Sequence, residues 1–157
     1  MPETDTSAKN PLHVSEVDDN LKELSPHGSF ELPVETYMAN CEIFHALYDH
    51  WHSEMEIMYI EKGSGFARLN RESIRLKKGD ILIVNCGVLH SMRTDLNNPL
   101  YYKSVVFGLG FLAGQPGDIC QECVVSPLME NRAEFCHHIE EGDSGYEKLR
   151  EIFLEIH

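Results

Sequence analysis

Hydrophobic residues gather in short runs through the middle of the chain, and turn-forming residues separate the runs. The runs are rich in Ile, Val, Tyr and Phe and recur at a spacing of roughly ten residues, which is typical of sandwiches and barrels. They are Met55–Ile60, Phe66–Leu69, Ser73–Leu76, Ile81–Val84 and Tyr101–Phe107. The pattern predicts an all-β unit that begins near Phe30 and ends near Phe107.

The two ends of the chain lack this pattern of short hydrophobic runs. Residues 1–28 are polar and rich in turn signals, which predicts an irregular N-terminal arm. We expect a barrel over residues 29–110 and a loop followed by helices over residues 111–157.

One amphipathic helix is predicted at the C-terminal end. Ser144 and Glu147 have the spacing of a capping box, in which each side chain satisfies a free amide of the first turn. An apolar stripe follows at helical spacing, made of Tyr146, Leu149, Ile152, Phe153 and Ile156. No stop signal precedes His157, so we expect this chain to be the front part of a longer protein.

Composition narrows the classes of function. The 157 residues suffice for one domain, and 13 basic against 26 acidic residues give a net charge of −13. Because DNA affinity rests on Lys and Arg at phosphates, this segment is not expected to touch DNA. The apolar runs are too short to cross a membrane, and no secretory signal begins the chain, so a cytoplasmic location is expected.

The five cysteines are odd in number, which argues against a disulfide framework. Cys120 and Cys123 have the spacing of a zinc half-site, and Cys136 follows later. The second half-site lacks a clean spacing, so incidental cysteines are the favoured interpretation.

One cluster of residues carries candidate chemistry. His50, His52 and Glu56 share parity, and equal parity in a strand places side chains on one face. We expect His90, after the run Ile81–Val84, to lie opposite them across the barrel wall. Imidazole and carboxylate are ligands of Zn, Ni, Fe and Mn, so these four residues form either a divalent-metal site or a hydrogen-bonded cluster without metal. In either case they are the expected ligand-binding residues.

The spacing of these residues resembles the two signatures of the cupin superfamily. The pattern H-x-H-x3-E-x6-G is met by His50, His52, Glu56 and Gly63 without a gap. The second signature, G-x5-P-x-G-x2-H-x3-N, is met at its two glycines and its histidine by Gly79, Gly87 and His90, while Asn85 replaces proline and Thr94 replaces asparagine. The resemblance implies a mainly β, double-stranded β-helix or jelly-roll barrel followed by C-terminal helices.

A narrower resemblance is to the amino-terminal sensor domain of AraC-family transcription regulators. It rests on the following segments: the run from His27 to Val34, His50-Trp51-His52, Tyr59-Ile60, Lys78-Gly79-Asp80 and the run from Val84 to Ser91. The resemblance implies a small-molecule effector such as a sugar, a homodimer, and contact with DNA only through a domain absent from this chain. The alternative is a stand-alone metal-dependent cupin enzyme, a dioxygenase or a sugar isomerase. The continuing helix favours the sensor, and the intact ligand set favours the enzyme.

Overall fold

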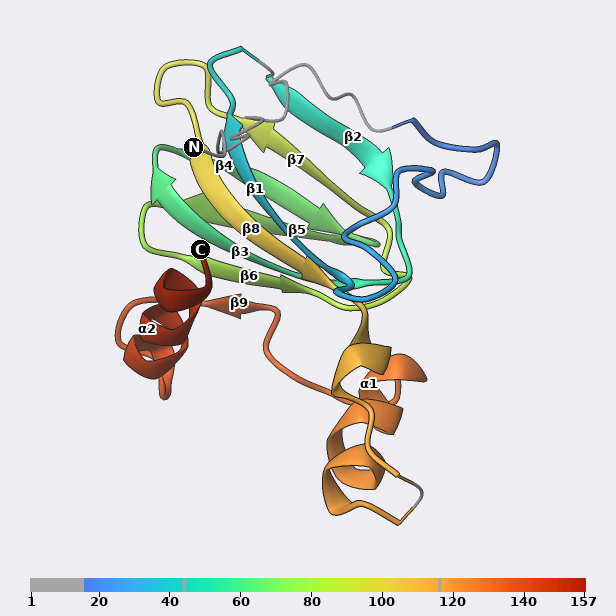
Figure 1. Cartoon of the computed structure of the whole chain (residues 1–157). Helices are drawn as coiled ribbons and strands as arrows, with labels where there is room; N and C mark the ends of the chain where they lie inside the picture. Colours follow the sequence, from blue (N-terminus) through green and yellow to red (C-terminus); the bar gives the residue numbers. More distant parts are fainter. Residues whose placement is uncertain (1–15, 44, 116) are drawn as a thin grey trace, which may run out of the picture.

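The computed structural model describes residues 16–43, 45–115 and 117–157, and strands dominate it (Figure 1). The strands are β1 (Val34–Asn40), β2 (Ala46–His50), β3 (Met55–Lys62), β4 (Ser64–Leu69), β5 (Glu72–Lys77), β6 (Ile81–Val84), β7 (His90–Thr94), β8 (Tyr101–Phe107) and β9 (His138–Ile139). The helices are the 3-10 turn η1 (Leu109–Leu112), the π-helical turn η2 (Gln121–Val125), α1 (Ser126–Met129) and α2 (Tyr146–Ile156). Over the described ranges, no helix combines the length and apolar character needed to cross a membrane.

The strands form two antiparallel sheets that face each other. One sheet has the order β1-β8-β3-β6-β9, and the other has the order β2-β7-β4-β5. Strands adjacent in the sequence thus alternate between sheets at several points, as in a jelly-roll cupin barrel. The predicted mainly β cupin fold is confirmed. The first strand begins at Val34, whereas Phe30 is 99% exposed in the segment before it. Residues 1–15 of the predicted arm lie outside the described residues.

Apolar side chains from both sheets fill the space between them. On β3, Met58 and Ile60 point inward and are almost fully buried, while Ile57 and Tyr59 belong to a separate cluster on the outer face. This alternation follows from the two-residue period of a strand. The inner cluster also contains Leu69, Leu76, Leu82, Val84, Met92, Leu100 and Tyr102.

The C-terminal helix α2 covers the outer face of the first sheet (Figure 1). Tyr146 and Phe153 are buried there against Tyr59, whereas Ile152 is 42% and Ile156 is 55% exposed. The predicted stripe therefore packs only in part on its own barrel.

The predicted capping box at the start of α2 is wrong. Gly145 is the N-cap residue, with φ of 84°, and no side chain caps the helix. Glycine adopts this left-handed conformation without a steric penalty, so the chain enters the helix through backbone geometry instead of a Ser144 hydrogen bond.

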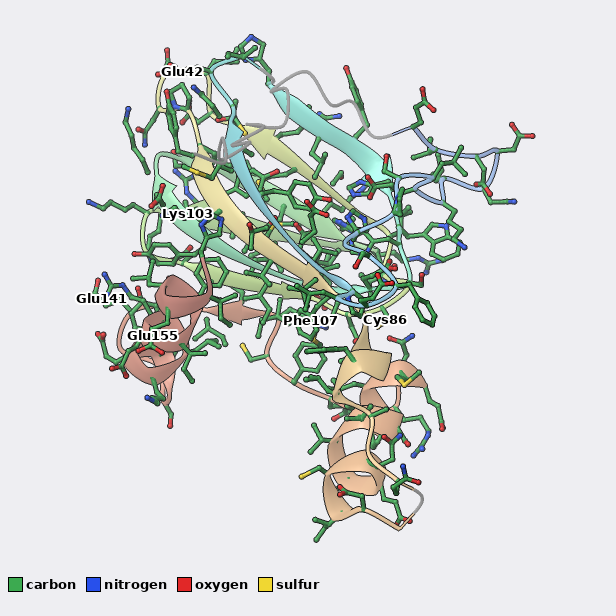
Figure 2. All side chains as sticks on the ribbon, viewed as in Figure 1. Glu42, Cys86, Lys103, Phe107, Glu141 and Glu155 are labelled. Atoms are coloured by element: carbon green, nitrogen blue, oxygen red, sulfur yellow. The ribbon has the colours of Figure 1, made fainter. Side chains whose placement is uncertain are left out.

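The other helical segment, η1 to α1, packs against the end of the barrel where β8 ends and the loop after β6 begins. Figure 2 places the labelled Cys86 and Phe107 together at this junction, with Glu42 at the opposite end. A third apolar cluster joins Met55 and Cys86 of the barrel to Leu109 and Val125 of the segment. The loop that follows β6 is thus in direct contact with helical residues.

Candidate functional site

Four side chains converge at the end of the barrel where the two sheets meet. His50 is the last residue of β2 and His90 the first of β7, and the two are register partners. Glu56 comes from β3 in the opposite sheet, and His52 from the connection between β2 and β3. All four are buried, with exposed fractions of 4% for His50, 4% for His52, 7% for Glu56 and 2% for His90. The structure thus brings together every residue that the motif indicated.

The reasoning from strand parity was wrong in one respect. His50, His52 and Glu56 do not lie on one strand, because β2 ends at His50 and β3 begins at Met55 in the other sheet. The chain crosses between sheets through His52, so the three side chains approach one centre from different directions. This arrangement surrounds the centre instead of lining one wall.

The backbone orients all three imidazoles in the same way. The Nδ1 atom of His50 lies 2.9 Å from the Tyr48 carbonyl oxygen, that of His52 lies 3.1 Å from Glu54 O, and that of His90 lies 2.9 Å from Val88 O. A carbonyl oxygen only accepts, so each Nδ1 donates a proton. Each neutral ring therefore presents the lone pair of Nε2 to the centre, and such outer hydrogen bonds are typical of metal-ligating histidines.

The distances between the imidazole nitrogens and the Glu56 carboxylate leave room for a proton or a metal ion between them. His52 Nε2 lies 3.5 Å and His90 Nε2 lies 3.4 Å from a Glu56 carboxylate oxygen. His90 Nε2 is buried and makes no hydrogen bond within the described part of the chain, so its contact with Glu56 is an ion-pair distance only. A carboxylate facing imidazole lone pairs is unfavourable unless a proton or a metal ion lies between them. The ligand atoms of the three histidines lie within 4.8 Å of one another, which fits a divalent transition ion.

The protonation equilibria of the four groups are mutually coupled. Burial would raise the pKa of Glu56, but His52 and His90 hold it well below its ordinary value. Burial and the neighbouring His90 lower the pKa of His50. Burial opposes the positive charge of His52, yet the hydrogen-bonding Glu56 carboxylate raises its pKa above the ordinary value. Glu56 is thus an anionic carboxylate within the site, and the pKa values of His50 and His52 are shifted in opposite directions.

Two residues of the N-terminal arm also reach this site, and the motif did not indicate them. A Glu23 carboxylate oxygen lies 3.9 Å from His50 Nε2 and 3.1 Å from His27 Nε2. The His27 ring lies 5.1 Å from the His52 ring. No spacing rule links residues 23 and 27 to position 50, because the arm reaches the barrel through tertiary contacts.

The arm is attached through the indole residue between the two motif histidines. Glu23 N donates to Trp51 O at 2.9 Å, Trp51 N donates to Leu21 O at 3.0 Å, and the indole Nε1 donates to Asn20 O at 2.9 Å. Trp51 therefore fixes the arm beside His50 and His52.

The three exposed cysteines do not join this site. Cys120, Cys123 and Cys136 are free and exposed, and across residues 16–43, 45–115 and 117–157 no candidate metal group includes them. A hollow of about 350 Å³ outside the barrel is apolar, with Ile57, Ile83, Leu128 and Phe135 in its wall. It lies away from the histidines, so the candidate chemistry belongs to the barrel interior.

Comparison with known proteins places the chain in a family. The profile of the AraC-like ligand binding domain matches residues 14–148. An uncharacterised helix-turn-helix type transcriptional regulator of Bacillus subtilis, YdeC, is 41% identical over 76 residues, covering 47% of this chain and 26% of that protein. Acireductone dioxygenase of Tuber melanosporum is 39% identical over 63 residues, covering 37% of this chain and 35% of that protein.

A cupin protein from Bacteroides fragilis is among the similar solved structures. It has a TM-score of 0.48 and 22% identity, covering 54% of this chain and 73% of that one. The chain spans only about a quarter to a third of the length of the two curated relatives above. Because the family profile covers most of the sequence, the chain belongs to the AraC-like ligand-binding domain family.

Proposed function

We propose that this chain is the effector-sensing module of a DNA-binding transcription regulator, and that His50, His52, Glu56 and His90 form its ligand-binding centre. The observation that carries the proposal is the convergence of three inward-facing Nε2 atoms and one carboxylate in a domain of this family. The net charge of −13 opposes DNA contact by these 157 residues, which supports assigning that contact to another domain of the regulator.

The same four residues would hold a divalent transition metal such as Zn, Ni, Fe or Mn. A bound ion would supply Lewis acidity and an open position for the oxygen atoms of a small polar effector, such as a sugar. The protein's own part is to orient the imidazoles through the carbonyl oxygens of Tyr48, Glu54 and Val88. Burial of the cluster excludes competing water.

Calorimetric titration with Zn²⁺ tests the metal proposal. We expect one ion per chain, and we expect His90→Ala to weaken binding by roughly 100-fold or more, since even outer-shell changes cost 10–100-fold. His45→Ala is the matched control, because His45 is exposed and lies outside the candidate metal groups. Equal affinity of the wild type and His90→Ala would leave only a hydrogen-bonded cluster.

Thermal-shift screening tests the effector proposal. We expect sugars and other small polar metabolites to include a compound that raises the melting temperature, because a ligand that binds only the folded state stabilises it. His52→Ala should abolish the shift. A compound that shifts the wild type and His52→Ala equally would place its binding site elsewhere.

A metal-dependent cupin enzyme is the second candidate function. It is favoured by the similarity to acireductone dioxygenase, together with the imidazole and carboxylate donors of the four-residue centre. Oxygen consumption or isomerisation that depends on metal and is lost in His52→Ala would establish the enzyme and overturn the purely sensory role.

We further propose a cytoplasmic homodimer formed through α2. The exposed Ile152 and Ile156 on the helix leave apolar surface that a second copy would bury, and two-fold dimers are the commonest oligomers. Analytical ultracentrifugation over a concentration series should show dimer formation that Ile156→Asp weakens. Monomer alone at high concentration would contradict this proposal.

A further inference from the structure

We propose that Glu23 of the N-terminal arm is an additional ligand of the metal held by His50, His52, Glu56 and His90, so that metal binding and docking of the arm stabilise each other. The inference rests on the proposed metal site and adds to it a residue outside the cupin motif.

The first support is the position of the Glu23 carboxylate. Its oxygen lies 3.9 Å from His50 Nε2, comparable with the 3.5 Å and 3.4 Å that separate Glu56 from His52 and His90. The side chain of Glu23 is only 6% exposed. The Glu23 oxygen also lies within 4.8 Å of a ligand atom of His52. Glu23 and Glu56 therefore reach the same histidine cluster from two different parts of the chain, the N-terminal arm and β3.

The second support is the electrostatics of the pair. His50 donates from Nδ1 to Tyr48 O, so a neutral His50 presents its Nε2 lone pair to Glu23. Two such acceptors face each other favourably only across a cation. A metal ion satisfies both groups at once.

The third support is the group that orients the carboxylate. His27 lies between Glu23, at 3.1 Å from Nε2, and the Tyr37 hydroxyl, at 2.7 Å from Nδ1. A carboxylate oxygen only accepts, so His27 Nε2 donates to Glu23. The Nδ1 atom of the neutral His27 ring then accepts from the Tyr37 hydroxyl. Tyr37 and His27 are therefore positioning residues, and they resemble the outer shell that commonly fixes metal ligands.

The consequence is a link between the centre and a segment far from it in sequence. Lys22 directly precedes Glu23 in the arm and is exposed, so trypsin cleavage after Lys22 reports on release of the arm. Coupling between two binding events is reciprocal, and typical values correspond to 5–150-fold. If Glu23 binds the ion, Zn²⁺ should slow this cleavage by a factor in that range.

The experiment compares the wild-type chain with Glu23→Gln, Glu23→Asp and Glu54→Gln by Zn²⁺ calorimetry and by the rate of cleavage after Lys22. Glu54→Gln is the matched control, because it removes the same charge from the Nδ1 side of His52 and keeps the Glu54 backbone carbonyl that orients this ring. Glu23→Asp keeps the charge and shortens the side chain, so it separates ligation from a general field effect. It also retains an acidic side chain should Glu23→Gln fold poorly.

We expect Glu23→Gln and Glu23→Asp each to weaken Zn²⁺ binding about tenfold or more, with Glu54→Gln close to wild type. Zn²⁺ should slow cleavage in the wild type and in Glu54→Gln but not in Glu23→Gln. Wild-type affinity or undiminished protection in Glu23→Gln would overturn the inference and leave the four-residue centre intact. Absence of Zn²⁺ binding in the wild type would overturn both, because Glu23 would then have no ion to bind.

Discussion

The two sheets of the barrel differ in how far their outer faces are covered. The sheet β1-β8-β3-β6-β9 is covered on its outer face by α2, and the strand β3 at its centre is buried on both faces. The sheet β2-β7-β4-β5 keeps an outer face with exposed residues, such as Tyr48 at 75% and Phe66 at 49% exposure. The candidate site draws His50 and His90 from the open sheet and Glu56 from the covered one.

The two sheets also differ in how they connect the site to the helical segment η1 to α1. The loop after β6 joins the covered sheet to β7 of the open sheet, and its Cys86 packs against the helical segment. Asn85 in that loop donates to Leu128 O at 2.9 Å and to Asn131 Oδ1 at 2.8 Å. The same loop donates from Gly87 N to His52 O at 2.8 Å. A change at the site is therefore expected to reach the helices through this loop.

The largest expected effect concerns packing on the covered sheet. Phe153→Ala empties a buried position between α2 and Tyr59, and such substitutions cost about 3–5 kcal/mol of unfolding free energy. Ile152→Ala on the same helix, at 42% exposure, should cost far less in a monomer. Chemical denaturation measures both. Equal losses that depend on protein concentration would show that Ile152 is buried in a dimer.

The second effect tests the loop that joins the covered sheet to the helices. Asn85→Ala removes the side-chain donor to Asn131 Oδ1 and one of the donors to Leu128 O, which costs roughly 1–3 kcal/mol. Hydrogen exchange should accelerate over residues 126–132. Asn98→Ala is the matched control, because the Asn98 side-chain amide donates to the Ser64 hydroxyl in an exposed hydrogen bond outside this loop. Unchanged exchange in Asn85→Ala would remove the proposed route from site to helices.

The sequence predicted the strands well because their signals are local. Lys77-Lys78-Gly79-Asp80 breaks the chain before Ile81, and β6 begins there. The motif spacing likewise indicated His50, His52, Glu56 and His90, since the register of two antiparallel strands converts fixed spacing into proximity.

Other features depended on information that no local pattern carries. Glu23 and His27 reach the site because Trp51 binds the arm, a contact between residues about thirty positions apart in sequence. The start of α2 depends on the left-handed backbone of Gly145, which replaced the expected Ser144 cap. The fate of the α2 stripe depends on which surfaces are already occupied, so periodicity predicted the helix without telling which residues are buried.

The third effect contrasts two histidines of the site through pH. The pKa of His52 is raised above 6.5 and that of His50 is lowered below it. Zn²⁺ must displace a proton from His52 at pH values where His50 is already neutral. Affinity should therefore fall with decreasing pH, first through the His52 pKa, by up to about 1.4 kcal/mol for each pH unit.

The metal-free chain should show the opposite contribution from His52. A raised folded pKa contributes stability that is fully present below the unfolded pKa and lost as pH rises through the folded value. Calorimetry and denaturation between about pH 5.5 and pH 8 measure the two trends, with values chosen around the ordinary histidine pKa. Zn²⁺ affinity that is constant over this range would exclude His52 as a ligand.

The smallest expected effect belongs to the open sheet. Arg68 of β4 reaches across to Asp49 of β2, and both side chains are substantially exposed, at 50% and 36%. Exposed ion pairs contribute about 0–1 kcal/mol because water and salt screen them. Arg68→Ala should therefore change the unfolding free energy by about 0.5 kcal/mol or less, and added salt should erase the difference.

Asp49 directly precedes His50, so the same variant also tests whether the outer face of the open sheet influences the site. Because the His50 ring is held by its own hydrogen bond to Tyr48 O, Zn²⁺ affinity should stay within about twofold of wild type. A loss of Zn²⁺ affinity comparable with that of His90→Ala would mean that the open sheet also controls the position of His50, and the contrast between the two sheets would fail.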